Sequence, residues 1–273
     1  MSGGENPGWP VPGDLTRAYG RSPFLSARVA QALASRVRSR FASLLVAGAI
    51  PRPGAGQGVL LYTNHPSWWD PAVFATLQTK LFKDRPGFGP IEARALSTYP
   101  FLNRAGFIGL DPKEPASIRR FLQEARSILK RGGVFWITAQ GRFADVRERP
   151  LAIRPGVAHL AASCRTALIV PVALEYVSGA GSRSEIAVLF GTPLEAGEGL
   201  RPSSLTATLE AALEETMDLL AERVVAGEFS GFEAVFGRRD ERDDGPGGVY
   251  ALFRRLITGL TSVGRRGHRN AQT

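Results

Sequence analysis

The sequence predicts an α/β protein with a mixed, largely parallel central sheet flanked by helices. Short apolar runs of strand length recur between residues 58 and 191, and stretches with apolar residues at helical spacing lie between them. Strands that alternate with helices are typical of sheets whose parallel strands are joined by helical crossovers. The chain has 273 residues, of which 44% are hydrophobic and 22% are charged. This is the composition of a folded globular protein, and it excludes a disordered or collagen-like chain.

The individual elements follow from local signals. Pro71, Pro115 and Pro155 each open a helical pattern, at a first-turn position where the missing N–H costs nothing. The predicted strands are continuous apolar runs, as expected for strands that are buried on both faces. We expect strands over 58–63, 107–110, 134–138, 167–176 and 185–191, and helices over 71–79, 115–130, 155–164 and 203–225.

Four segments are expected along the chain. Residues 1–23 are rich in Gly and Pro and predict a flexible leader. Residues 24–50 have apolar side chains every three or four positions with arginines between them, which indicates an amphipathic basic helix. That helix either packs on the domain alone or also contacts lipid. The main domain is expected over 51–237, followed at 238–273 by a linker and a basic amphipathic segment that contains a last helical pattern.

The positive charge is concentrated at the two ends. The net charge is +9, of which residues 1–50 carry +4 and residues 238–273 carry another +4. Basic ends beside a nearly neutral centre suit attachment to an anionic membrane surface. A nucleic-acid-binding protein is the alternative, but the sequence contains no recognised nucleic-acid-binding motif.

The compartment follows from two further features. The single cysteine, Cys164, cannot form an intrachain disulfide. The longest apolar runs fall short of the roughly 18 residues of a membrane-spanning helix. We therefore expect a cytoplasmic protein that binds peripherally to the inner face of the membrane.

The most informative residues follow the first strand of the main domain. His65 comes directly after that strand, at the edge where α/β sheets bind ligands, and Asp70 comes five residues later. In a tight loop the carboxylate would fix the imidazole tautomer and leave the outer nitrogen free as a general base. The alternatives are that Asp70 caps the following helix and that His65 is an ordinary loop residue. Because no G-x-S-x-G nucleophile accompanies the pair, we expect the substrate to supply the hydroxyl.

These residues resemble the first block of the glycerolipid acyltransferases, the group that includes lysophospholipid and 1-acylglycerol-3-phosphate acyltransferases. The shared pattern is Asn64-His65-x4-Asp70-Pro71, the His-x4-Asp motif. Residues 106–111, 140–142 and 169–172 are similar to the second, third and fourth blocks, in the family's order. The resemblance extends over about residues 59–190.

The resemblance implies transfer of a fatty acyl group from acyl-CoA or acyl carrier protein to a hydroxyl of a lysophospholipid or related lipid. His65 would be the general base, and Asp70 would orient it. The acyl donor and the lipid acceptor would be the partners, together with an anionic membrane surface, and no metal or further cofactor is implied. Trp68 and Trp69 are candidates for the acyl channel, with a role in the core as the alternative.

The second and third blocks imply the acceptor site, and both depart from the family. Pro112 stands where the second block usually has Arg, and Gln140 stands where the third usually has Glu. Because of these two departures, the acceptor could be a lipid other than a glycerol phosphate. The candidate acceptor-binding residues are Lys113, Gln140, Gly141 and Arg142, with Arg147, Arg149 and Arg154 as substitutes.

An esterase or thioesterase that uses the same His–Asp pair on water is the main alternative function. The sequence leaves open the identity of the acceptor, the length of the acyl chain, the choice between CoA and carrier protein, and the oligomeric state.

Overall fold

A central mixed sheet organises the part of the chain that this computed structural model describes, which is residues 20–178, 183–194 and 202–237. Within these ranges the sheet has eight strands in the order β4-β3-β5-β2-β6-β7-β1-β8. Their bounds are β1 Leu44–Gly48, β2 Val59–Thr63, β3 Gly87–Glu92, β4 Phe107–Leu110, β5 Val134–Thr138, β6 Leu168–Val177, β7 Glu185–Phe190 and β8 Glu233–Phe236.

Most neighbouring strands are parallel. The pairs β4–β3, β3–β5, β5–β2, β2–β6 and β7–β1 are parallel, whereas β6–β7 and β1–β8 are antiparallel. The predicted fold class, a mixed and largely parallel sheet flanked by helices, is confirmed.

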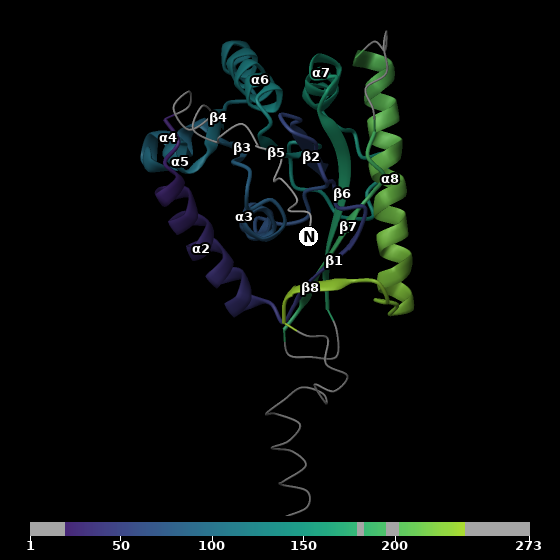
Figure 1. Ribbon diagram of the computed structural model, residues 1–273. Helices are drawn as coiled ribbons and strands as arrows, with labels where there is room; N and C mark the ends of the chain where they lie inside the picture. Colours follow the sequence, from purple (N-terminus) through teal and green to yellow (C-terminus); the bar gives the residue numbers. More distant parts are fainter. Residues whose placement is uncertain (1–19, 179–182, 195–201, 238–273) are drawn as a thin grey trace, which may run out of the picture.

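Helices cover both faces of this sheet (Figure 1). The helices α6, α7 and α8 lie on one face, and α2 and α3 lie on the other, while the short α4 and α5 lie beside the β3–β4 end. Their bounds are α2 Pro23–Arg40, α3 Asp70–Leu81, α4 Ala93–Thr98, α5 Phe101–Ala105, α6 Pro115–Lys130, α7 Pro155–Ser163 and α8 Pro202–Ala226.

The strand β2 lies at the centre of the core. It pairs with β5 on one side and β6 on the other, and all five of its residues are buried. Leu60 and Tyr62 pack into the core under α6–α8, whereas Val59 and Leu61 pack into the core under α2 and α3. A shift of one residue would exchange these two faces, so the register is strongly fixed. The residues that follow Thr63 therefore leave the sheet at a defined place.

The prediction of one helix over 24–50 is wrong. The helix α2 ends at Arg40, and the chain then becomes extended and forms β1, which pairs with β7 and β8. The apolar run of β1 continues the helical spacing, but four of its five residues are buried as a strand. A short buried strand cannot be told from a buried helical segment by periodicity alone. The sheet therefore begins at Leu44, before the expected domain start at residue 51.

Some short elements were not predicted. The strand β3 contains glycines and a proline, the strand β8 has only four residues, and α4 and α5 have six and five residues. None of these carries a strong apolar period, so tertiary packing rather than local pattern forms them. The expected leader lies almost wholly outside the described residues, as does the whole of the expected segment 238–273.

The helix α2 packs on the domain along one side. The Ser26 hydroxyl donates a hydrogen bond to the Ala105 carbonyl, and Val37 is fully buried. The helix also packs against α3. Among the described helices, none combines the length and the apolar character needed to cross a bilayer.

We expect Gly48→Ala to destabilise the sheet much more than Gly227→Ala. Both glycines have positive φ, +92° and +68°, so alanine at either position costs about 1–2 kcal/mol of backbone strain. A Cβ at Gly48 would also overlap the main-chain oxygen of Phe190, whereas a Cβ at Gly227 meets open space. The additional loss in the free energy of unfolding at Gly48 should be about 1–3 kcal/mol, measured by denaturant titration. Equal losses in the two variants would contradict the close approach of β1 and β7.

Candidate active site

The candidate site begins where β2 ends, and Asn64 holds that end in place. Its side-chain Nδ2 donates to the Leu174 carbonyl over 2.9 Å, and its Oδ1 accepts from the Leu174 N–H over 2.9 Å. The buried amide thus pairs with β6 as a main-chain peptide group would. This allows the main chain of the next residue to turn away from the sheet.

The main chain of His65 is fixed from the loop that follows β5. The His65 N–H donates to Oε1 of Gln140 over 3.0 Å, and the His65 carbonyl accepts from the Ala144 N–H over 3.0 Å. Gln140 is buried, and its Nε2 has no hydrogen-bond partner among the described residues. Exchanging the two amide atoms would bring two donors together, so the bond to His65 fixes how Gln140 is oriented.

The imidazole of His65 is hydrogen-bonded to a fully buried carboxylate. Its Nδ1 lies 2.6 Å from Oδ2 of Asp70, and the Ser67 N–H donates to the same oxygen over 3.2 Å. The Tyr176 hydroxyl donates to the other oxygen, Oδ1, over 2.6 Å. A carboxylate surrounded by donors acts as an acceptor, so Nδ1 carries the proton and Nε2 is left free to accept one.

This geometry also corrects the alternative role of Asp70. The residue that caps α3 is Trp69, and no side chain makes a capping hydrogen bond there. Asp70 is the first helical residue, and its carboxylate turns back to the loop. Its two oxygens are used by His65, Ser67 and Tyr176 rather than by the helix N-terminus.

Tyr176 stays protonated in this environment. Burial raises its pKa, and the neighbouring Asp70 raises it further through its charge and its hydrogen bond. The hydroxyl is therefore a permanent donor to Asp70. Its ring also packs against Phe41, with the ring centroids 5.3 Å apart.

The His65 ring is partly covered but accessible. The Phe143 ring lies over it at a centroid distance of 4.3 Å, and Phe143 itself is exposed. The side chain of His65 retains 16% of its accessible surface. A reactant can therefore reach the imidazole from solvent beside Phe143.

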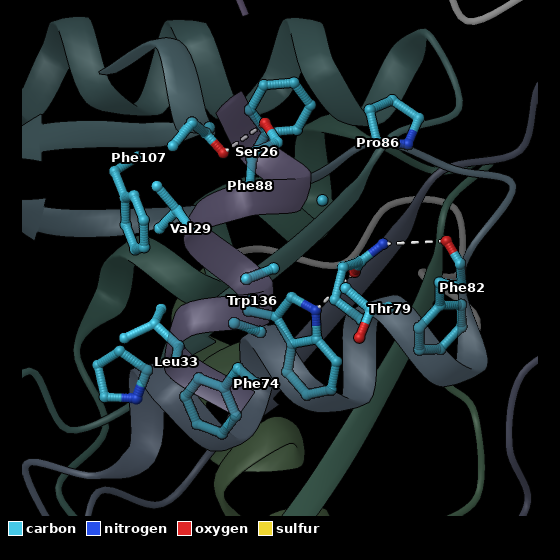
Figure 2. A pocket seen from close by; sticks show the side chains of 18 of the residues that line it. Ser26, Val29, Leu33, Phe74, Thr79, Phe82, Pro86, Phe88, Phe107 and Trp136 are labelled. Carbon is cyan, nitrogen blue, oxygen red and sulfur yellow. Dashed lines mark hydrogen bonds between the residues drawn. The ribbon is translucent and has the colours of Figure 1, made fainter. Parts of the chain in front are cut away.

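An apolar cavity of ≈ 450 Å³ opens beside His65. It follows α3 between α2 and the strands β3–β5, and aromatic side chains form much of its wall (Figure 2). The indole Nε1 of Trp136 donates to Oε1 of Gln78 over 2.9 Å, which leaves the ring itself as apolar wall. The aromatic lining residues are Phe74, Phe82, Phe88, Phe107 and Trp136.

The two tryptophans of the motif are not part of this cavity. Trp68 and Trp69 stack on each other with centroids 4.3 Å apart, and neither lines the cavity wall. Trp68 is 68% exposed, while Trp69 packs edge-on against Phe41. In the turn before them, the Trp69 N–H donates to the Ser67 hydroxyl over 3.2 Å.

The four predicted acceptor-binding residues do not form one group. Gln140 holds His65, and Gly141 forms the turn that follows it, with φ +62°. Arg142 is exposed and forms an ion pair with Glu148, whose pKa is lowered mainly by that hydrogen bond. Lys113 is exposed and follows β4, which β3 and β5 separate from β2. Three strand spacings are roughly 14 Å, so Lys113 is not brought beside His65.

Two other features of the region bear on its chemistry. Arg154 lies against Gly141, where an added Cβ would sit 3.2 Å from its Cγ. Within the described ranges, no group of three or more His, Cys, Asp or Glu side chains is arranged to hold a metal ion.

Two comparisons with known proteins bear on the family and the fold of this chain. Residues 44–175 match the Acyltransferase family model. The chain contains an acyltransferase domain. The fold of this acyltransferase is similar to the crystal structure of the 1-acyl-sn-glycerophosphate (LPA) acyltransferase PlsC from Thermotoga maritima. The TM-score is 0.53 and the identity is 13%, over 72% of this chain and 80% of that one. A search of curated proteins returns no significant match.

The sequence alone did not identify several residues of the candidate site. Tyr176 reaches Asp70 from the end of β6, and Gln78 and Trp136 shape the cavity from α3 and β5. The carboxyl ends of neighbouring parallel strands meet at one edge of a sheet. Because Tyr176 lies near the end of a strand that is parallel to β2, this rule could have placed it near His65. The cavity residues carry no local signal, because core and cavity aromatics look alike in a sequence.

We expect Tyr176→Phe to lower kcat for acyl transfer by about 10-fold while changing KM little. The variant keeps the ring that packs on Phe41 but removes a hydrogen bond to a charged group, typically worth about 1.5–3 kcal/mol. Steady-state kinetics would measure the change. Tyr99→Phe, at an exposed tyrosine on the C-terminal side of α4, is the matched control and should have no effect. An unchanged kcat in Tyr176→Phe would show that its bond to Asp70 does not support His65.

Proposed function

We propose that this acyltransferase moves a fatty acyl group from an acyl thioester, acyl-CoA or acyl carrier protein, to a hydroxyl of a lysophospholipid or related lipid. The observation that carries the proposal is that His65, held by buried Asp70, lines one end of the apolar cavity. An apolar cavity beside a general base suits an acyl chain whose carbonyl is presented to that base. We further propose that the enzyme works at the inner face of the membrane, where such an acceptor lies, and needs no cofactor.

In the proposed reaction, Nε2 of His65 removes the proton from the acceptor hydroxyl. The hydroxyl oxygen attacks the thioester carbonyl, a C–O bond forms and the C–S bond breaks. The departing thiolate then takes the proton back from His65. The Asp70 carboxylate stabilises the intervening imidazolium, and no covalent acyl-enzyme is formed.

For the acceptor, we propose Arg154 as the cation that binds an anionic head group. Arg142, Arg147 and Arg149 already form ion pairs with Glu148, Asp145 and Asp218. No ion pair involves Arg154 in the part of the chain that the structure describes, and its side chain lies against the Gly141 turn. That turn follows Gln140, which contacts His65. A guanidinium suits a phosphate or carboxylate because it donates two parallel hydrogen bonds.

The proposal is tested with a panel of lyso-lipids and labelled acyl-CoA or acyl carrier protein, with products identified by mass spectrometry. Wild-type protein should form an acylated lipid, and His65→Ala should lose about 10²–10⁴-fold of the rate. His159→Ala, at an exposed histidine of α7, is the matched control and should keep the wild-type rate. Circular dichroism would show that the variants remain folded.

Two results would contradict the proposal. Release of free fatty acid at the same rate with and without acceptor would identify a thioesterase. A folded His65→Ala variant that keeps a tenth or more of the wild-type rate would rule out His65 as the base.

We expect Arg154→Ala to raise the KM for the lipid acceptor by about 10-fold or more and to leave the KM for the acyl donor nearly unchanged. The lost interaction is a charge-assisted hydrogen bond to the acceptor anion. Arg142→Ala removes an arginine of the same loop whose partner is Glu148, and it should change neither KM. If Arg142→Ala affects the acceptor and Arg154→Ala does not, the assignment of Arg154 is wrong.

A further inference from the structure

The end of the cavity far from His65 is polar, unlike its middle. His65 and Pro71 lie beside the start of α3, whereas residues 83–86 follow the end of α3 and line the opposite end. Figure 2 shows Leu33 and Phe74 toward one end, and Ser26, Phe88 and Pro86 toward the other. The polar groups that line this second end include Arg21, Gln78 and Arg85.

Arg21 is the unusual member of this group. Burial lowers its pKa, and its Nε is buried without a hydrogen-bond partner. Among residues 20–178, 183–194 and 202–237, its guanidinium forms no hydrogen bond and no ion pair. Its contact is with the face of Phe88, whose ring centroid lies 5.6 Å from the guanidinium carbon. A cation–π contact compensates part of the cost of burying a charge, but it satisfies none of the N–H donors.

The neighbouring Arg85 shows how a cation at this end is usually satisfied. Its guanidinium donates to the main-chain carbonyls of four residues in the surrounding turns: Pro53, Gly54, Gln57 and Gly132. Arg85 therefore has a structural role. Arg85 uses its N–H donors within the protein, whereas the N–H donors of Arg21 are available to a ligand in the cavity.

The main chain at Gly106 borders this guanidinium. Gly106 has φ +108°, and an added Cβ would lie 3.4 Å from Nε of Arg21 and 2.7 Å from the Gly87 oxygen. A Cβ added at Gly87 would overlap the Gln78 side chain, 2.4 Å from its Cδ. Arg21, Gly87 and Gly106 all line the cavity, so the guanidinium lies at the cavity wall beside main chain that carries no side chain.

We infer that Arg21 recognises the distal end of the acyl chain, and that the preferred donor ends in a carboxylate rather than in a methyl group. The inference rests on the proposed function, in which the thioester lies at His65 and the chain extends along α3. A distal carboxylate would accept the unused N–H donors of Arg21 in a bidentate pair. A methyl group there would bury the guanidinium further and leave its donors unsatisfied.

The test compares acyl-CoA donors in pairs of equal length, one ending in a methyl group and the other in a carboxylate, from octanoyl to hexadecanoyl. At the length that reaches Arg21, wild-type enzyme should prefer the carboxylate by about tenfold or more in kcat/KM, as expected for hydrogen bonds to a charged group. Arg21→Met should abolish the preference and improve the methyl-ended donors, and Arg21→Lys should keep part of it. Arg28→Met, at an exposed arginine of α2 outside the cavity, should behave as wild type.

A preference for the methyl-ended donor at every length, or the same ratio in wild type and Arg21→Met, would overturn the inference. Turnover of the methyl-ended donors tests the proposed function separately. A second readout needs no turnover: wild-type protein should bind decanoate more tightly than 1-decanol in calorimetry, and Arg21→Met should bind them equally. Equal binding of decanoate and 1-decanol by wild-type protein would also overturn the inference.

Discussion

The position of the candidate base depends on the pairing of β2 between β5 and β6. This pairing is parallel on both sides, and its register is fixed by side chains buried on both faces. The neighbouring strands also supply the groups that surround the strand end. Gln140 and Ala144 come from the loop after β5, and Asn64 is bonded to Leu174 of β6. Asn64, His65, Ser67 and Asp70 are local in sequence, whereas Gln140, Ala144 and Tyr176 are brought to them by the sheet.

A buried carboxylate without a cationic partner needs hydrogen bonds to remain an acceptor. Asp70 has three donors, from a main-chain N–H, a hydroxyl and the imidazole that it orients. The loss of any one donor would destabilise the buried carboxylate, because a buried charge with unmet hydrogen bonds costs several kcal/mol. The arrangement gives His65 a fixed tautomer in the resting enzyme, before any substrate binds.

The sequence predicted the elements with strong local signals and missed those formed by packing. The strands β2, β5, β6 and β7 are apolar runs and were located to within one or two residues, and the proline-initiated helices were as well. The residues of β1 were predicted as part of the preceding helix because its leucines continue a helical spacing. At the site, the five-residue separation of His65 and Asp70 is local and was recognised. Tyr176 lies 106 residues from Asp70 along the chain, and no local pattern relates them. Trp68 and Trp69 lie outside the cavity wall, and the sequence around them gives no indication of which way a tryptophan ring points.

The position of α2 means that the shape of the cavity and the placement of His65 and Asp70 depend on different parts of the chain. This helix forms one wall of the cavity, yet it precedes residue 44, where the match to the Acyltransferase family model begins. It contributes none of the hydrogen bonds that position His65 and Asp70. Substitutions on its inner face would thus reshape the cavity without removing a hydrogen bond of His65 or Asp70. The space inside the cavity and the hydrogen bonds around His65 can therefore be changed by separate substitutions, because different segments of the chain build them.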